Sequence, residues 1–258
     1  MMASPPLRIL TDSSTERSGV RWRRFDLNRD GRRIPGILWT PAGATGPHRL
    51  VLLGHGASGN KSQDYVESMA KRLVRHKGLA AAAIDGPVHG DRRLEGAEAD
   101  SSEVFLHFAQ VWSSDDTMTD EMVQDYQATV DALQDLEDIG VGPVGWWGLS
   151  MGTILGLPFV AADTRVAAAV LGCMGMTGPT RARIQADAPR ISCPVLFLVQ
   201  WDDELFARDT AFALFDAIAS QDKRLHASVG RHGSVPPEEF AASEEFLAGR
   251  LLARGSLC

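Results

Sequence analysis

The sequence predicts an α/β domain whose central sheet is mostly parallel and carries helices on both faces. Short, almost continuously apolar runs indicate strands buried on both faces, and they alternate with segments whose apolar residues recur at helical spacing. This alternation is typical of βαβ units, in which each helix returns the chain to start a parallel strand. The strand patterns lie at residues 49–53, 79–84, 144–147, 166–171, 194–199 and 225–229. The helical patterns lie at residues 62–76, 123–136, 153–162, 205–220 and 238–252.

The beginning of the chain has a different character. The first 19 residues are rich in Ser, Thr, Pro and Arg, and we expect them to form a flexible lead-in. Residues 20–27 and 33–40 have β patterns and are joined by Asn28-Arg29-Asp30-Gly31, a strong hairpin-turn sequence. The sequence therefore predicts an N-terminal antiparallel hairpin at the edge of a single domain that covers residues 20–258.

Composition limits the partners and the location of the protein. A chain of 258 residues, 44% of them apolar, can bury one large core. The net charge of −7 and the pI near 5.5 disfavour nucleic acid and anionic membranes as partners, because those surfaces bind basic patches. The three cysteines lack metal-ligand spacing, and no stretch reaches the ~20 apolar residues that span a bilayer. With no signal-peptide pattern at the N-terminus, we expect a cytoplasmic protein.

One predicted strand-to-helix junction carries a motif with chemical meaning. Gly148-Leu149-Ser150-Met151-Gly152 has the pattern G-x-S-x-G and joins the strand at 144–147 to the helix at 153–162. In this position the glycines permit a turn tight enough to lift the serine hydroxyl above the sheet, beside the free N–H groups of a helix N-terminus. The motif alone is weak evidence, because an ordinary loop in a chain with 25 glycines could contain it.

A base and an acid follow the serine at the ends of later strands. Asp202 and Asp203 come after the strand at 194–199, and His232 comes after the strand at 225–229. The carboxyl ends of parallel strands meet at one edge of the sheet, where such folds build their sites. A serine hydroxyl needs a base within hydrogen-bond reach, and that base needs a carboxylate to fix its tautomer. His232 is the candidate base, because it lies after the acids in a glycine-flanked loop.

In this order the serine motif, the acid and the histidine resemble the α/β-hydrolase superfamily, from about Val20 onward. The similarity is to its serine esterases and dienelactone-hydrolase-like members. It implies an α/β-hydrolase fold and a catalytic triad of Ser150, Asp203 and His232. Asp203 is favoured because the run Asp203 to Phe206 fits the family's acid followed by a helix start. Asp202 is the alternative acid, and a helix cap or solvated carboxylate is its simpler interpretation.

The resemblance also assigns an oxyanion hole. The strand at 49–53 is followed by the H-G-x turn His55-Gly56-Ala57, which implies that the backbone N–H groups of Ala57 and Met151 hold the oxyanion. We expect His55 to orient this turn by hydrogen bonding. A single H-G-x turn, without a run of three glycines, departs from the esterases that accept tertiary alcohols. The candidate substrate-pocket residues are His55, Trp201, Met174 and Met176.

Two further segments are expected to shape specificity. Residues 91–120 form a long insertion with an apolar patch, predicted as a helix that either leans over the site or packs on the flank of the domain. His107 lies within this insertion and is a further histidine that the site could use. The usual cap position holds only residues 174–191, which are too few for a large lid. The cap is therefore predicted to be small or absent.

The predicted function is hydrolysis of carboxylic esters with small to medium acyl groups, through an acyl-enzyme on Ser150. This chemistry needs no metal or organic cofactor. Dienelactone hydrolases have a cysteine nucleophile, so the serine favours ordinary ester chemistry. Thioesterases, lactonases, peptidases and C–C bond hydrolases use the same triad and remain alternatives. A non-catalytic ligand receptor on the same fold is an alternative of another class, although such relatives typically lose a triad member. The sequence leaves the oligomeric state open.

Overall fold

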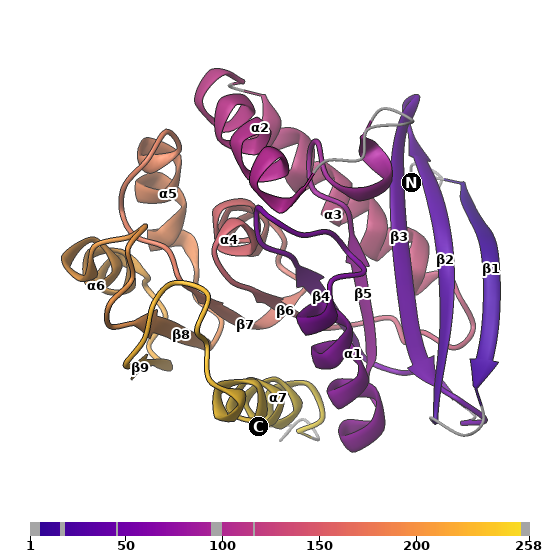
Figure 1. Cartoon of the computed structure of the whole chain (residues 1–258). Helices are drawn as coiled ribbons and strands as arrows, with labels where there is room; N and C mark the ends of the chain where they lie inside the picture. Colours follow the sequence, from indigo (N-terminus) through magenta and orange to yellow (C-terminus); the bar gives the residue numbers. More distant parts are fainter. Residues whose placement is uncertain (1–5, 16–18, 45, 94–99, 116, 254–258) are drawn as a thin grey trace.

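The computed structural model describes residues 6–15, 19–44, 46–93, 100–115 and 117–253, which form a central sheet flanked by helices (Figure 1). The strand order among the described residues is β1-β2-β3-β5-β4-β6-β7-β8-β9. Neighbouring strands from β5 to β9 pair in parallel, whereas β1, β2 and β3 are antiparallel to one another and β3 is antiparallel to β5. The mostly parallel α/β sheet is therefore confirmed. The strands are β1 Leu7–Thr15, β2 Val20–Arg29, β3 Arg32–Pro41, β4 Leu50–Gly54, β5 Ala80–Ile84, β6 Val144–Gly148, β7 Val166–Gly172, β8 Val195–Gln200 and β9 Lys223–Ser228.

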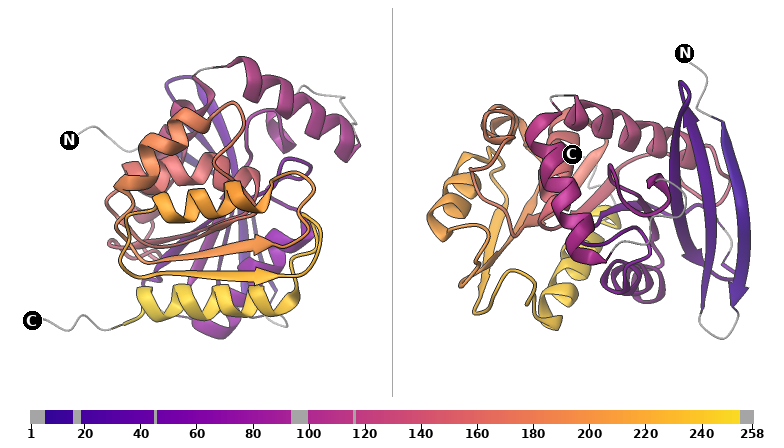
Figure 2. Two further views of the ribbon diagram at one scale, coloured as in Figure 1. Left: turned by 90° about the vertical axis from the view of Figure 1, so that its left-hand side faces the viewer. Right: turned by 45° about the horizontal axis from the view of Figure 1, so that its top comes forward.

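Helices cover both faces of this sheet (Figure 2). Helices α1 and α7 pack against each other and against one face, while α3 and α4 pack together on the opposite face. Each face buries its own apolar core, because a sheet covered on both sides needs two layers of apolar side chains. The helices are α1 Asp64–Lys77, α2 Ser101–Ser114, α3 Met118–Gln134, α4 Met151–Ala162, α5 Arg181–Asp187, α6 Arg208–Ala217 and α7 Pro237–Leu251, with 3-10 turns η2 Gly90–Arg92 and η3 Ala188–Arg190.

The two tryptophans of β6 show how the strand serves both cores. Trp146 packs with Tyr126 and Phe159 in the core beneath α3 and α4, whereas Trp147 packs in the core beneath α1 and α7. Both side chains are buried. They lie on opposite faces of the sheet, because successive side chains of a strand alternate between its two faces. Strand β6 therefore lies at the centre of the molecule, and the residues that follow it are held firmly.

The prediction of a flexible lead-in is wrong for residues 7–15. These residues form β1, which pairs antiparallel with β2 from Leu7 opposite Leu27 to Thr15 opposite Val20. Strand β1 is an edge strand, and even its apolar side chains Ile9 and Leu10 are exposed. Polar composition is typical of an edge strand, because one side of the strand has no partner to bury it. The other lead-in residues, 1–5 and 16–18, lie outside the described residues.

The predicted hairpin is present between β2 and β3. Its two turn residues, Asp30 and Gly31, have φ angles of 52° and 85°. Positive φ at both positions defines the turn type that matches the twist of two antiparallel strands. The Asn28 side chain accepts a hydrogen bond from the Gly31 N–H at 2.8 Å and closes the turn.

The two segments expected to shape specificity contain short helices. The insertion holds η2 and α2, and Phe108 of α2 is buried in the core over α4. Residues 94–99 and 116 of the insertion lie outside the described residues. The cap position holds α5 and η3 and no larger element. Among the described residues, none of the helices has the length and apolar character needed to cross a membrane.

Candidate active site

Ser150 occupies a strained turn between β6 and α4. Its φ of 57° and ψ of −119° lie outside the regions that non-glycine residues usually adopt. A Cβ on Gly148 would lie 2.8 Å from the Gly152 carbonyl oxygen, and one on Gly152 would lie 2.7 Å from the Gly54 carbonyl oxygen. Only glycine fits at both positions, so these two residues let β4, β6 and α4 approach closely enough to hold the turn.

The structure brings Ser150, His232 and Asp203 into one hydrogen-bonded chain. His232 Nε2 lies 2.9 Å from Ser150 Oγ, and His232 Nδ1 lies 2.8 Å from Asp203 Oδ2. The carboxylate can only accept, so Nδ1 carries the imidazole proton and Nε2 is free to accept the serine proton. The side chains of His232 and Asp203 are only 16% and 4% exposed, which shields their interaction from water.

The geometry distinguishes the two candidate acids. The second oxygen of Asp203, Oδ1, accepts hydrogen bonds from the backbone N–H groups of Leu205 and Phe206 at 2.8 and 3.0 Å. These bonds orient the carboxylate with Oδ2 toward the histidine. Asp202 is exposed, and its own N–H donates to the Gly230 carbonyl at 2.9 Å. Asp203 is therefore the residue in contact with His232.

Glu204 is a site residue that the sequence pattern did not indicate. One of its carboxylate oxygens accepts the His232 backbone N–H at 3.0 Å, and the other forms an ion pair with Arg231 at 3.2 Å. Accepting that N–H lowers the pKa of Glu204. The ring of Phe206 also packs near the imidazole, with ring centroids 5.6 Å apart. Both contacts hold the loop that carries His232.

The predicted oxyanion donors lie beside Ser150. Ala57 lines the same cavities as Ser150, and Met151 is the first residue of α4, so its N–H has no acceptor within the helix. Tyr65, in the first turn of α1, accepts the Gly56 N–H on its hydroxyl oxygen at 2.5 Å. Burial raises the pKa of Tyr65 to about 12, so the phenol stays protonated at neutral pH. Tyr65 thus fixes the turn that carries Ala57.

His55 does not line the pocket, and this part of the predicted site is corrected. Its ring is 2% exposed, with Nδ1 2.9 Å from the Gly56 carbonyl and Nε2 accepting the Gly86 N–H at 2.8 Å. Burial and the nearby His89 lower the pKa of His55 to about 3. A neutral imidazole is therefore buried under the oxyanion turn, where it fulfils the predicted orienting role.

The other three predicted pocket residues also lie elsewhere. The Trp201 ring is 42% exposed and packs against the Arg208 guanidinium, 4.3 Å from its centroid. Met174 is fully buried in the core, and Met176 packs against the same core. These methionines are core packing residues, which is the role that flexible apolar side chains commonly take. Their neighbour Cys173 does line the site, but burial raises the pKa of its thiol to about 12, so it is not a nucleophile at neutral pH.

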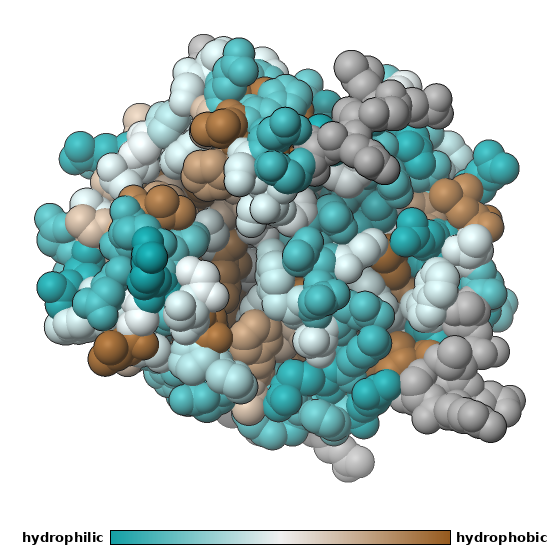
Figure 3. Space-filling model, viewed as in Figure 1, coloured by the Kyte–Doolittle hydropathy of each residue, from teal (hydrophilic) through white to brown (hydrophobic). Residues whose placement is uncertain are grey.

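Ser150 lies between two cavities. The first, of about 380 Å³, includes His232 and is called the histidine cavity. The second, of about 250 Å³, is bounded by α2 and is called the α2 cavity. Figure 3 shows apolar surface inside a hollow near the middle of this face of the molecule. The two cavities share Ala57, Phe105, Ser150 and Leu205.

Several residues that line the histidine cavity were not predicted as site residues. Phe105 belongs to the apolar patch of the insertion, so the predicted helix contributes a side chain to the cavity that Ser150 lines. Trp147, which packs in the core beneath α1 and α7, also lines this cavity. The remaining unpredicted residues of this cavity are Gly56, Ser58, Tyr65, Leu149, Leu205, Gly233, Val235 and Phe240.

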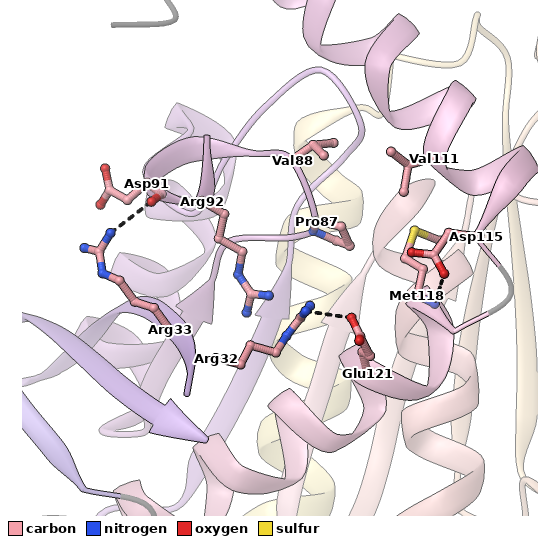
Figure 4. A pocket seen from close by; sticks show the side chains of 10 residues that line it. All are labelled: Arg32, Arg33, Pro87, Val88, Asp91, Arg92, Val111, Asp115, Met118 and Glu121. Atoms are coloured by element: carbon pink, nitrogen blue, oxygen red, sulfur yellow. Dashed lines mark hydrogen bonds and ion pairs between the residues drawn. The ribbon is translucent and has the colours of Figure 1, made fainter. Parts of the chain in front are cut away.

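A larger hollow of about 520 Å³, here called the arginine pocket, lies between β3, η2, α2 and α3 (Figure 4). Its lining contains three arginines and three acidic residues, so its formal charges balance, and it contains no hydroxyl, thiol or imidazole group. Beneath it, the fully buried Asp125 accepts from Arg32 at 2.9 Å and pairs with Arg92 at 2.8 Å. Its charges thus hold elements together. The lining residues are Arg32, Arg33, Pro87, Val88, Asp91, Arg92, Val111, Asp115, Met118 and Glu121.

The sequence matches the model of the alpha/beta hydrolase family over residues 50–253. The chain belongs to the α/β hydrolase family. The resemblance predicted from the motifs and their order is therefore confirmed, and it agrees with the sheet and with the turn at Ser150. Among the described residues of this hydrolase, no group of three or more His, Cys, Asp or Glu side chains could hold a metal ion.

Solved structures give closer relatives. The PEG-bound complex of a cold-adapted esterase from an Arctic intertidal metagenomic library has 39% sequence identity and a TM-score of 0.82, covering 94% of this chain and 98% of that one. A dienelactone hydrolase-like promiscuous phosphotriesterase from metagenomic libraries has 25% identity and a TM-score of 0.65, covering 85% and 86%. Acetyl xylan esterase 1 from Thermoanaerobacterium sp. JW/SL YS485 shares the fold, with 18% identity, a TM-score of 0.70, and coverage of 95% and 88%. No curated protein matches the sequence.

Proposed function

We propose that this α/β hydrolase is a carboxylic ester hydrolase that works through an acyl-enzyme on Ser150. The observation that carries the proposal is the hydrogen-bonded chain from Asp203 through His232 to Ser150, which ends on a hydroxyl at the junction of two cavities. The identity of 39% to an esterase over nearly the whole chain supports the same reaction class.

Acylation follows from the positions of these groups. Ser150 Oγ attacks the ester carbonyl carbon while its proton passes to His232 Nε2. The carbonyl oxygen becomes an oxyanion, which the N–H groups of Ala57 and Met151 stabilise. The protonated His232 then gives its proton to the departing alkoxide, and the alcohol leaves. Asp203 keeps the imidazole in the required tautomer and stabilises its positive charge.

Deacylation repeats the same steps with water as the nucleophile. His232 Nε2 takes a proton from a water molecule, which attacks the acyl carbon, and the same two N–H groups stabilise the second oxyanion. The histidine then returns the proton to Ser150 Oγ and the carboxylic acid leaves. Every proton transfer thus runs through one nitrogen, and none of these steps needs a metal or an organic cofactor.

The cavities support small to medium substrates. Both are lined mainly by apolar side chains and together enclose a few hundred Å³, which suits a neutral ester with modest groups on each side of the carbonyl. The short cap of α5 and η3 leaves the site without a large lid.

The test is hydrolysis of p-nitrophenyl esters by purified wild type and by Ser150→Ala. We expect the variant to lose at least ~10³-fold in kcat, because removal of a nucleophile leaves only binding and oxyanion stabilisation. Ser113→Ala is the matched control, because its exposed hydroxyl bonds to the Ala109 carbonyl within α2. Equal rates for wild type and Ser150→Ala on every ester would refute ester hydrolysis at this serine.

A further inference from the structure

The two cavities at Ser150 are not equivalent with respect to His232. The imidazole lines the histidine cavity, together with residues of α1 and α7 such as Tyr65 and Phe240. The α2 cavity adjoins it at Ser150 and extends along Ile154 of α4 and Phe108 of α2, and His232 is not among its lining residues. An ester with its carbonyl at Ser150 has one cavity available for each of its two groups.

The chemistry of ester cleavage decides which group goes where. In the tetrahedral intermediate the leaving oxygen must lie within reach of His232 Nε2, which protonates it, while the oxyanion points to Ala57 and Met151. The acyl chain takes the remaining direction, away from the imidazole. On the basis of the proposed ester hydrolysis, we propose that the α2 cavity binds the acyl group and the histidine cavity binds the alcohol group, with Trp112 as the wall that limits acyl length.

Trp112 is held in place from three sides. Its ring stacks on Phe108, with centroids 6.0 Å apart and planes at 14°. Its Nε1–H donates to Thr180 Oγ1 at 3.0 Å, which ties α2 to the short cap. The six-membered part of the ring lies close to Gly178, where a Cβ would come within 2.5 Å of Trp112 Cη2. A side chain fixed in this way forms a rigid end wall, whereas a mobile one would yield to longer chains.

The lining of the α2 cavity indicates the class of acyl group. Among the described residues that line it there is no charged side chain, and its walls are aromatic and aliphatic rings and chains. Burial of a carboxylate or ammonium there would leave the charge unpaired, which is costly. The acyl group is therefore a neutral, apolar chain whose length is set by the distance from Ser150 to Trp112.

The experiment uses two ester series on the purified enzyme. In the first, p-nitrophenyl esters vary the acyl group from acetate to decanoate; in the second, acetate esters vary the alcohol from methyl to octyl. Trp112→Ala is expected to raise kcat/KM for long relative to short acyl groups by at least about tenfold, since each methylene accepted in an apolar pocket is worth about 10- to 200-fold. Across the alcohol series, the kcat/KM values of Trp112→Ala should keep the same order as those of wild type.

Two variants make the test independent of the folding of Trp112→Ala. Ala109→Leu adds bulk to the α2 cavity at a half-buried position and should shift the acyl preference toward shorter chains. Phe240→Ala enlarges the histidine cavity and should change the alcohol series while leaving the acyl series unchanged. Trp22→Ala removes a tryptophan on β2, outside both cavities, and should change neither series.

Each outcome bears on the proposal. If Trp112→Ala or Ala109→Leu altered the alcohol series and Phe240→Ala altered the acyl series, the assignment of the cavities would be reversed. An active wild type whose acyl profile stayed the same in both α2-cavity variants would overturn the role of Trp112 while leaving ester hydrolysis intact. If the wild type hydrolysed none of the esters, the proposed function itself would be refuted.

Discussion

The Ser150 site and the arginine pocket are both hollows beside α2, but their polar groups are arranged differently. In the arginine pocket, Arg32 and Arg92 converge on the buried Asp125, and Arg32 also pairs with Glu121 at 2.6 Å. At the Ser150 site, each polar group orients the next, and the chain ends on a hydroxyl exposed to a cavity. Charges that neutralise one another stabilise the packing of elements, whereas a chain that ends on an open nucleophile performs chemistry. The larger hollow is therefore not the reactive one.

The largest expected effect is at the acid of the site. Asp203→Asn should reduce kcat by about 10⁴-fold, because an amide in this position enforces the wrong histidine tautomer. The Leu205 and Phe206 N–H groups need an oxygen acceptor, so the amide NH₂ must turn toward His232 Nδ1. The imidazole proton then moves to Nε2, which no longer accepts from Ser150. Steady-state kinetics on a p-nitrophenyl ester measures the loss.

Asp202→Asn is the matched control for the acid. Its side chain is exposed, and surface substitutions of this kind change stability by about 0.5 kcal/mol or less, so kcat should remain near the wild-type value. The opposite pattern, with an inactive Asp202 variant and an active Asp203 variant, would contradict the geometry of the site.

A substitution beneath the arginine pocket should lower the stability of the protein and leave its catalytic activity unchanged. Asp125→Ala leaves the guanidinium groups of Arg29, Arg32 and Arg92 without their shared buried partner, and loss of one member of a buried ion pair costs about 3–5 kcal/mol. Urea denaturation measures the fall in the free energy of unfolding. The kcat of the folded variant should stay close to that of wild type.

A pair on the surface gives the control for Asp125. Asp12 on β1 pairs with Arg21, and both side chains are about two-fifths exposed, so Asp12→Ala should cost less than about 1 kcal/mol. If the two variants lost the same stability, or if Asp125→Ala abolished activity while folded, the contrast between a structural pocket and a reactive site would fail.

The histidine beneath the oxyanion turn predicts a loss of stability in acid. Burial lowers the pKa of His55 from 6.5 to about 3, so between these values the unfolded chain binds a proton that the folded chain does not. Stability therefore falls as the pH drops below 6.5, by roughly 3 kcal/mol at about pH 4 for this residue. Urea denaturation at several pH values in this range gives the free energy of unfolding at each. That free energy should fall less steeply with decreasing pH for His55→Gln than for wild type. An identical pH dependence in the two proteins would show that His55 protonates freely when folded.

The smallest effect concerns the tyrosine that fixes the oxyanion turn. Tyr65→Phe removes the acceptor of the Gly56 N–H, and an unsatisfied buried N–H costs about 1–3 kcal/mol. We expect kcat to fall by about tenfold, because the displaced turn carries Ala57. Tyr126→Phe removes the other tyrosine hydroxyl of the chain, which α3 buries in the core, and should leave kcat unchanged. Equal kcat values in wild type and Tyr65→Phe would remove Tyr65 from the positioning of the turn.

The sequence predicted those features of the Ser150 site that follow from the order of strands and helices along the chain. The Ser150 turn lies between a strand and a helix, and Asp203 and His232 follow later strands, so their carboxyl ends bring the three residues to one edge of the sheet. Contacts such as His232 to Asp203 then follow from topology. The choice of Asp203 over Asp202 depended on a family pattern, and the structure gives its physical basis in the N–H groups of Leu205 and Phe206.

Other features could not be predicted, because they depend on tertiary contacts that the spacing of apolar residues does not reveal. Met174 and Trp201 lie next to site segments in sequence, but their side chains point into the core and toward the surface. Strand β1 escaped prediction because an edge strand needs few apolar residues. The sequence did contain a signal for Tyr65. This residue lies in the first turn of a helix that starts at the edge where the parallel strands end, so its side chain lies near the site.

Covalent labelling can decide whether Ser150 is the activated nucleophile. Wild type, Ser150→Ala and Ser58→Ala are treated with a dialkyl fluorophosphate, and intact mass and peptide mapping locate the adduct. Ser58 lines the histidine cavity with a second serine hydroxyl and so controls for mere accessibility. We expect one phosphoryl group per chain on Ser150 in wild type and Ser58→Ala, and none in Ser150→Ala. An adduct that persists in Ser150→Ala, or an active wild type that is never labelled at Ser150, would show that Ser150 is not the nucleophile.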